Sequence, residues 1–176
     1  MQQPVENQLD INEPRWFAVY TRHKAEKVVA RLLTSKKIES YLPICKRVRK
    51  YDRKVRIFEL PLISGYVFVK IIKAEYVTVL ETENVVNFVK FARNLIAISD
   101  REINILRRVT DDETIEIALE KTTFVQGDRV KIAHGNLYGL EGTLVSAQGK
   151  NKLLVELENL GYTLYLTVNS SLLEKI

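Results

Sequence analysis

The stretch "ELPLISGYVFVKI", residues 59–71, decides the fold of the N-terminal half of this chain. After a Pro-Leu turn it continues as a β-strand of aromatic and β-branched residues. Side chains of a strand alternate between two faces. One face is aliphatic and is formed by Val67, Val69 and Ile71. The other carries Tyr66 and Phe68 before Lys70. A half-buried strand needs only one apolar face, so the sequence raises the question of what covers the second.

The composition is that of a globular protein, with 46% hydrophobic and 28% charged residues. No apolar run approaches the roughly 18 residues that a transmembrane helix needs. The polar, acidic N-terminus "MQQPVENQLDINEP" lacks the apolar region of a secretory signal. The single cysteine, Cys45, excludes an internal disulfide and fits a reducing cytoplasm, where we expect the protein. Its basic neighbours are expected to lower the pKa of its thiol.

Charge divides the chain into two halves. Residues 13–109 hold 21 Lys/Arg against 10 Asp/Glu, whereas residues 110–176 hold 6 against 10. This asymmetry predicts two domains with different partners, of which only the first favours phosphate groups. We expect a disordered lead-in at 1–13, an N-terminal domain at 14–109, an acidic linker at 110–123 and a C-terminal domain at 124–176. The linker is either flexible or a helical extension.

The N-terminal half alternates strands with amphipathic helices. Its clearest helix is "HKAEKVVARLLTSKKI", whose apolar residues recur at i, i+3, i+4, i+7 and i+8. The predicted strands lie at 15–21, 40–49, 55–71 and 84–91, and the predicted helices at 23–38, 73–82 and 99–109. This order predicts an α+β sandwich around a mostly antiparallel sheet.

The C-terminal half reads as all-β. Five short apolar segments are separated by turns rich in Gly and Asn. They are "DRVKIA", "GLEGTLVSAQG", "NKLLVELEN", "YTLYLTV" and "SLLEKI". About 50 residues in five short strands predict a small closed β-barrel.

The sequence shows no catalytic constellation. Its two histidines, His23 and His134, lie in different halves, and neither has a partner at a metal-ligand spacing. Glycine-rich phosphate-binding motifs are absent from the sequence. We therefore expect a protein that is not an enzyme and that uses no metal and no cofactor.

The densest charge lies in "KRVRKYDRKVR", residues 46–56, at the tip of the predicted hairpin. One interpretation is a strand edge kept apart from other chains by charge. We favour a surface that faces nucleic acid, because seven mutually repelling cations exceed what such an edge needs. These cations are Lys46, Arg47, Arg49, Lys50, Arg53, Lys54 and Arg56. A weaker basic stripe on the first helix, at helical spacing, consists of Lys24, Lys27 and Arg31.

Three segments, "RWFAVYTRHKAEKVVARLL", "PLISGYVFVKI" and "NVVNFVKF", resemble the N-terminal (NGN) domain of NusG-type transcription elongation factors. "GDRVKIAHGNLYGLEGTLVSAQGKNKLLVEL" resembles their C-terminal KOW domain, an SH3-like barrel. The resemblance covers roughly residues 14–176. The chain is most similar to the specialised UpxY-type antiterminators, which are relatives of RfaH. It departs from the family at three turn positions, Ser64, Leu95 and Asn136.

This resemblance implies an answer to the opening question. In the family, the second face of the N-terminal sheet docks on the clamp helices of the largest RNA polymerase subunit and suppresses pausing and termination. By position, the docking residues would be Tyr20, Tyr66, Phe68, Phe91 and Ile103. The alternative is that an extra helix or the second domain covers these side chains permanently.

The resemblance also implies contacts with nucleic acid and with a protein partner. Arg22, His23 and Lys24 match the segment of RfaH that contacts the displaced non-template DNA strand, while Glu83 stands where the family has a second contact, an arginine. The KOW domain would recruit a ribosomal protein or Rho to a monomeric factor. Two other readings remain: a housekeeping NusG factor acting with Rho, and a ribosomal KOW-type RNA-binding protein, which would need a basic barrel.

Overall fold

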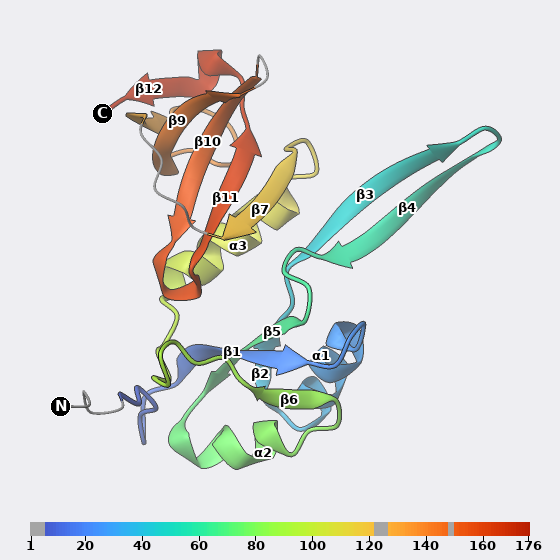
Figure 1. The fold of residues 1–176 in the computed structure, drawn as a ribbon, viewed down its shortest axis with the longest axis vertical. Helices are drawn as coiled ribbons and strands as arrows, with labels where there is room; N and C mark the ends of the chain where they lie inside the picture. Colours follow the sequence, from blue (N-terminus) through green and yellow to red (C-terminus); the bar gives the residue numbers. More distant parts are fainter. Residues whose placement is uncertain (1–5, 122–126, 148–149) are drawn as a thin grey trace. The chain divides into compact units, whose positions relative to one another are not determined.

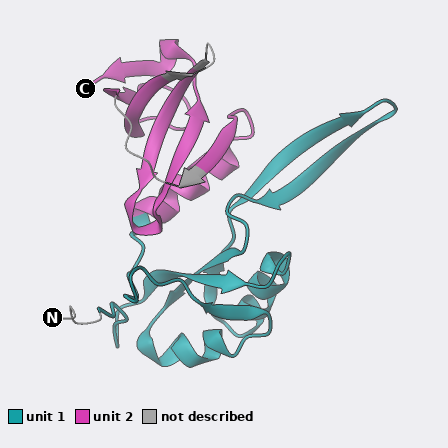
Figure 2. Cartoon of the chain, in the orientation of Figure 1, with its two compact units in different colours: residues 1–100 teal, residues 101–176 magenta. Residues whose placement is uncertain are grey.

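The computed structural model describes residues 6–121, 127–147 and 150–176, and the chain divides into two compact units, residues 1–100 and 101–176 (Figure 2). The first unit contains β1 (Arg15–Thr21), α1 (Glu26–Ser35), β2 (Glu39–Tyr41), β3 (Ile44–Tyr51), β4 (Lys54–Pro61), β5 (Tyr66–Ile71), the 3-10 helix η1 (Lys73–Glu75), α2 (Tyr76–Leu80) and β6 (Val85–Phe88). Among the described helices, none is long and apolar enough to cross a membrane.

The first unit is built on a four-stranded antiparallel sheet with the order β2-β5-β1-β6 (Figure 1). Its central pair, β1 and β5, is in register with Phe17 opposite Val69 and Val19 opposite Val67. These side chains pack in one buried cluster with residues of α1 and α2. The helical members of this cluster are Val29, Leu33 and Val79. The aliphatic face of β5 therefore forms the core, as the alternation in the sequence predicts.

The predicted strand pair at 40–49 and 55–71 is four strands rather than two. The chain leaves the sheet after β2 at Pro43 and returns at Leu62, whose N–H donates to the carbonyl of Pro43 at 2.8 Å. Between these points β3 and β4 pair only with each other and extend from the sheet as a two-stranded ribbon (Figure 1). A proline has no N–H with which to continue the ladder of β2, which explains the break.

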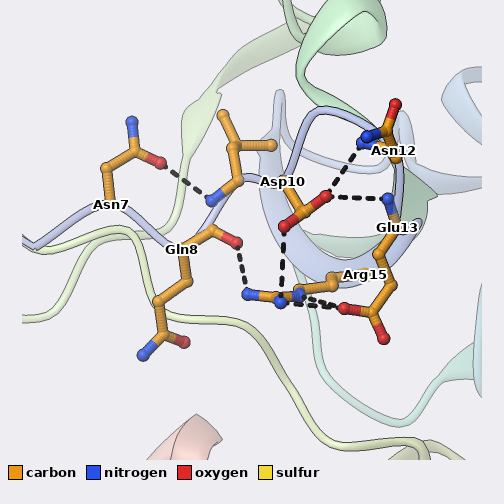
Figure 3. Close-up of polar contacts among 7 residues, drawn as sticks. Asn7, Gln8, Asp10, Asn12, Glu13 and Arg15 are labelled. Atoms are coloured by element: carbon orange, nitrogen blue, oxygen red, sulfur yellow. Dashed lines mark hydrogen bonds and ion pairs between the residues drawn. The ribbon is translucent and has the colours of Figure 1, made fainter.

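From Glu6 onward the N-terminal segment makes specific contacts, whereas the sequence predicts a disordered lead-in at 1–13, of which residues 1–5 lie outside the described residues. Its backbone pairs with Leu95 through bonds of 2.9 Å from the Gln8 N–H and to the Glu6 carbonyl. Arg15 then holds the segment through ion pairs with Glu13 at 2.8 Å and Asp10 at 3.6 Å (Figure 3). Backbone N–H groups of Glu13 and Asn12 hold the pKa of Asp10 below its usual value.

The second unit contains α3 (Asp100–Asp111), which begins at the last residue of the first unit, followed by β7 (Ile117–Lys121), β8 (Asp128–Ile132), β9 (Glu141–Ala147), β10 (Lys150–Leu157), η2 (Glu158–Leu160), β11 (Tyr162–Thr167), η3 (Ser170–Leu172) and β12 (Leu173–Lys175). Its strands form a six-stranded antiparallel sheet with the order β12-β8-β9-β10-β11-β7. The five predicted segments correspond to β8 to β12. The predicted α+β class is confirmed.

The segment between the halves differs from the expected linker. Residues 117–121 form β7, which pairs with β11 from Ile117 opposite Leu166 to Lys121 opposite Tyr162. The boundary between the units falls after Asp100, earlier than the sequence indicates, so α3 belongs to the second unit. Specific side-chain contacts explain this placement: Glu102 accepts hydrogen bonds from the N–H and the Nδ2 of Asn159 at 2.9 and 2.8 Å. Residues 122–126 of the predicted linker lie outside the described residues.

Candidate functional site

The second face of the central strands carries a pair of tyrosines. Tyr20 on β1 and Tyr66 on β5 are direct cross-strand partners. Their rings meet edge to face with centroids 4.9 Å apart, and the Tyr66 hydroxyl lies 3.1 Å from that of Tyr20. Tyr20 is 40% exposed and Tyr66 is half-buried. The pair therefore presents aromatic carbon and two hydroxyl groups at the surface in a fixed arrangement.

Further along this face the aromatic residues are buried. Phe68 is 0% exposed, and its ring stacks on that of Tyr41 from β2 with a centroid distance of 6.2 Å. Trp16, on the same face of β1, is also buried and donates from its Nε1 to Asp100 at 3.0 Å. Alternation along β1 could have identified Trp16 as a member of this face, because it lies four residues before Tyr20. The sequence analysis also did not identify Tyr41 as a residue of this face.

Two of the five expected docking residues therefore differ from expectation. Phe68 has no exposed surface in this structure. Ile103 lies on α3 in the second unit and is 1% exposed. Both side chains are buried, so neither offers contact surface in this structure. Tyr20, Tyr66 and Phe91 keep exposed side-chain surface.

Phe91 begins a tight two-residue turn after β6. Its N–H and carbonyl exchange hydrogen bonds of 2.9 and 2.8 Å with Asn94. The two central residues, Ala92 and Arg93, have φ of 47° and 71°. Such left-handed conformations favour Gly or Asn and cost other residues free energy. The chain thus holds this turn, with Phe91 and the exposed Arg93 at it, in a conformation that its own residues disfavour.

A buried carboxylate supports the start of β5. Glu26, in the first turn of α1, is 4% exposed and accepts a hydrogen bond from the Gly65 N–H at 2.7 Å. Gly65 has φ of 80°, which suits glycine, and it immediately precedes Tyr66. The contact joins residues far apart in sequence, so no local pattern could have predicted it.

The loop from β1 to α1 holds three candidate nucleic-acid contacts, Arg22, His23 and Lys24, all exposed. The loop is anchored by the Arg22 N–H, which donates to the Asn84 carbonyl at 2.9 Å. Lys24 has a left-handed φ of 58°. This turn explains why α1 begins at Glu26 rather than at the predicted residue 23. Exposed Glu83 precedes Asn84, so an acidic side chain neighbours the basic loop.

The basic stripe of α1 contacts an acidic residue at the base of the hairpin. Lys27 and Arg31 are exposed on α1, and Lys27 forms a 3.5 Å ion pair with Glu59 of β4. Both partners are half-exposed, so this pair contributes little stability. It does place the end of the hairpin beside the basic helix.

The hairpin displays its predicted cations to solvent: all seven Lys and Arg side chains of residues 46–56 are exposed. Strands β3 and β4 pair in register from Ile44 opposite Pro61 to Tyr51 opposite Lys54, leaving Asp52 and Arg53 as the turn.

At the base of the hairpin, burial raises the pKa of the Cys45 thiol and outweighs the effect of Arg47. The expected lowering of that pKa is wrong, because desolvation is the larger influence.

Within the described residues there is no group of three His, Cys, Asp or Glu side chains that could hold a metal ion.

The first unit carries 18 Lys/Arg against 11 Asp/Glu, and the second carries 9 against 11. The charge asymmetry of the sequence therefore follows the structural division.

Comparisons with known proteins place these features in a family. The family model described as "Transcription termination factor nusG" matches residues 14–107, more than half of the chain. A solved structure described as "Domain interaction in Thermotoga maritima NusG" is similar over 93% of this chain and 98% of its own, with 22% identity and a TM-score of 0.53. A structure described as "Crystal Structure of MjSpt4:Spt5 complex conformation A" covers 92% of this chain and 97% of its own, with 20% identity and a TM-score of 0.33. No curated protein matches the sequence. The family match spans the whole strand and helix framework that carries the tyrosine pair and the basic hairpin, and the chain belongs to the NusG family of transcription factors.

Proposed function

We propose that this NusG-family factor binds RNA polymerase through an aromatic docking surface formed by Tyr20, Tyr66 and Phe91. The exposed tyrosine pair is the observation that supports this proposal, because two rings locked edge to face lose little entropy on binding. Buried Phe68 would keep β5 rigid beneath the surface. The expected partner is the clamp-helix pair of the largest polymerase subunit.

The proposed effect is antitermination through a shift between polymerase conformations, with no catalysed reaction. A factor that binds only the closed clamp shifts the polymerase away from the opened states that pausing and termination require. The basic loop and hairpin would then lie beside the upstream duplex or the non-template strand. We further propose that the chain is a specialised factor of the UpxY type. Its second unit, with a slight excess of acidic residues, would recruit a ribosomal protein or Rho.

Binding of the full chain to an immobilised clamp-helix fragment tests the docking surface. The double variant Tyr20→Ser with Tyr66→Ser should weaken binding at least about tenfold, the loss expected of central aromatic anchors. Tyr51→Ser is a matched control, since it removes an exposed ring from the hairpin. Undiminished binding by a folded double variant would show that the docking surface lies elsewhere.

A second function, stimulation of termination with Rho, is favoured by the description of the matching family as a termination factor. Single-round transcription on a template with a Rho-dependent site separates the two functions. Antitermination predicts more read-through both at an intrinsic terminator on the same template without Rho and at the Rho-dependent site with Rho. The Rho-linked function predicts less read-through, and only with Rho.

A further inference from the structure

The hairpin formed by β3 and β4 has two chemically different faces. Because cross-strand partners point to the same face, the register sorts its side chains. One side, which we call the Arg-aromatic face, consists of Arg47, Arg49, Tyr51, Lys54, Arg56 and Phe58. The other side, the aliphatic face, consists of Lys46, Val48, Lys50, Val55, Ile57 and Glu59. Four cations and two aromatic rings thus share a face that has no acidic residue.

We propose that the Arg-aromatic face binds single-stranded nucleic acid by stacking bases on Tyr51 and Phe58 while its cations contact the phosphates. The proposal deepens the nucleic-acid part of the proposed function and rests on it only for the presence of nucleic acid nearby. A shared arrangement of basic side chains and aromatic rings is the usual platform for single strands.

The two rings are spaced for separate bases. Tyr51 pairs with Lys54 at the tip, and Phe58 pairs with Arg47 four positions along the ribbon. At about 3.3 Å per residue the rings are roughly 13 Å apart along the strands. Tyr51 is 52% exposed, whereas Phe58 is half-buried beneath Arg49, whose guanidinium carbon lies 5.7 Å from the ring centroid. A base at the second position would stack on this guanidinium or replace it.

The cations between the rings lack a compensating charge on their own face. Arg49 lies directly opposite Arg56, and like charges in that position destabilise a ribbon. A phosphate between them would relieve this repulsion. Tyr51, Lys54 and Arg56 also line a hollow at the hairpin tip together with Lys50, Asp52 and Arg53. Charge therefore selects an anionic ligand, and the rings select one with accessible base faces.

A single strand fits this surface better than a duplex does. In a duplex the base faces are stacked on one another, so neither ring could reach them without unpairing. A duplex would use only the cations, and replacing an aromatic ring by an aliphatic side chain would then cost little. Stacking is consequently the feature that separates the two ligands.

The test measures binding of the full chain to fluorescent oligonucleotides of deoxythymidine, of uridine and of a mixed duplex of equal length. Tyr51→Leu and Phe58→Leu remove the rings, and Ile57→Thr on the aliphatic face is the matched control. We expect each ring variant to weaken single-strand binding about 5- to 150-fold and to leave duplex binding unchanged. Ile57→Thr should leave both unchanged. The deoxythymidine and uridine arms show whether DNA or RNA is preferred.

Further measurements keep the result interpretable. Circular dichroism shows whether a ring variant has lost its fold, and crosslinking of 5-iodouracil oligonucleotides to wild-type protein should map to Tyr51 or Phe58. With four cations engaged, the logarithm of affinity should fall with the logarithm of salt at a slope of about −3. Equal affinity for duplex and single strand, equal loss in Ile57→Thr, or crosslinks outside the hairpin would each overturn the proposal. Binding of the ring variants to the clamp-helix fragment should stay intact. Failure of the hairpin proposal is thereby distinguished from failure of the proposed docking surface.

Discussion

The carboxylate of Glu26, in the first turn of α1, accepts a hydrogen bond from the backbone N–H of Gly65 at 2.7 Å, although 39 positions separate them. Glu26 is buried, and the contact fixes the turn that leads into β5. The helix therefore positions Tyr66, the next residue, and with it the tyrosine pair of the proposed docking surface.

Replacing Glu26 by Ala should lower the free energy of unfolding of the first unit by about 1–3 kcal/mol, because it leaves the partly buried Gly65 N–H without an acceptor. Glu26→Gln retains a side-chain carbonyl and should cost less. Denaturation followed by the fluorescence of Trp16, the single tryptophan of the chain, reports on this unit. Equal losses in the two variants would mean that the negative charge, rather than the hydrogen bond, matters.

The turn after β6 should be improvable by mutation. Arg93 has φ of 71° in a two-residue turn, where glycine suffers no steric penalty. Arg93→Gly should raise the stability of the first unit by about 1 kcal/mol. The same substitution at exposed Lys90, which is not among the described residues with positive φ, should lower stability or leave it unchanged. Stabilisation by both variants would point to relief of positive charge instead of backbone strain.

The carboxyl group of Asp112 links stability to pH. The Thr114 hydroxyl at 2.5 Å is the main cause that holds the pKa of Asp112 below its usual value, with further contributions from the Thr114 N–H at 3.0 Å and the Asn136 amide at 3.4 Å. Because the folded-state pKa is depressed, its stabilisation is present above the unfolded pKa near 3.9 and is lost as pH falls through the folded value.

Asp112→Asn should therefore destabilise the second unit at pH 6 and should reduce the loss of its stability between pH 6 and pH 3. Amide hydrogen exchange of residues in the second unit, measured across this pH range, follows both effects. Carbon-13 NMR of the carboxyl group gives the midpoint directly. A midpoint at or above 3.9 would contradict the predicted linkage.

The faces of the strands were predictable from the sequence, whereas the contacts between distant segments were not. A period of two assigns Val67 and Val69 to the core and Tyr66 to the opposite face without any knowledge of the partner strands. The same alternation sorts the hairpin, once its register is known. Pairing of Asn7 with Leu95 depends on residues nearly ninety positions apart, and nothing in the polar N-terminal sequence signals it.

Exposure was the least predictable property of the candidate site. Phe68 and Tyr66 belong to the same strand face, yet the first is fully buried and the second is not. The position of a residue on a strand face gives the direction of its side chain, but the neighbouring side chains decide how much of it is exposed to solvent. Ring stacking of Phe68 on Tyr41 is a cross-strand contact whose register the sequence does not reveal.

The placement of α3 gives the last prediction. Its Glu102 side chain accepts two hydrogen bonds from Asn159, and Arg108 donates to the carbonyls of Tyr138 and Asn136 at 2.8 and 3.2 Å. These contacts join the helix to two loops of the second unit. A fragment of residues 101–176 should therefore resist denaturant better than a fragment of residues 110–176, which lacks the acceptor for Asn159.

In the full chain, Glu102→Ala should lower the free energy of unfolding of the second unit by about 1–3 kcal/mol, since it leaves the Asn159 donors unpaired. Asn159→Ala in the Glu102→Ala background should add less than it does alone, because contacting residues are coupled. Amide hydrogen exchange in β9 to β11 follows the transition of the second unit, and Asp111→Ala, which replaces an exposed acidic residue of α3, serves as the control. Additive losses, together with equal stability of the two fragments, would return α3 to the first unit and restore the domain boundary near residue 109.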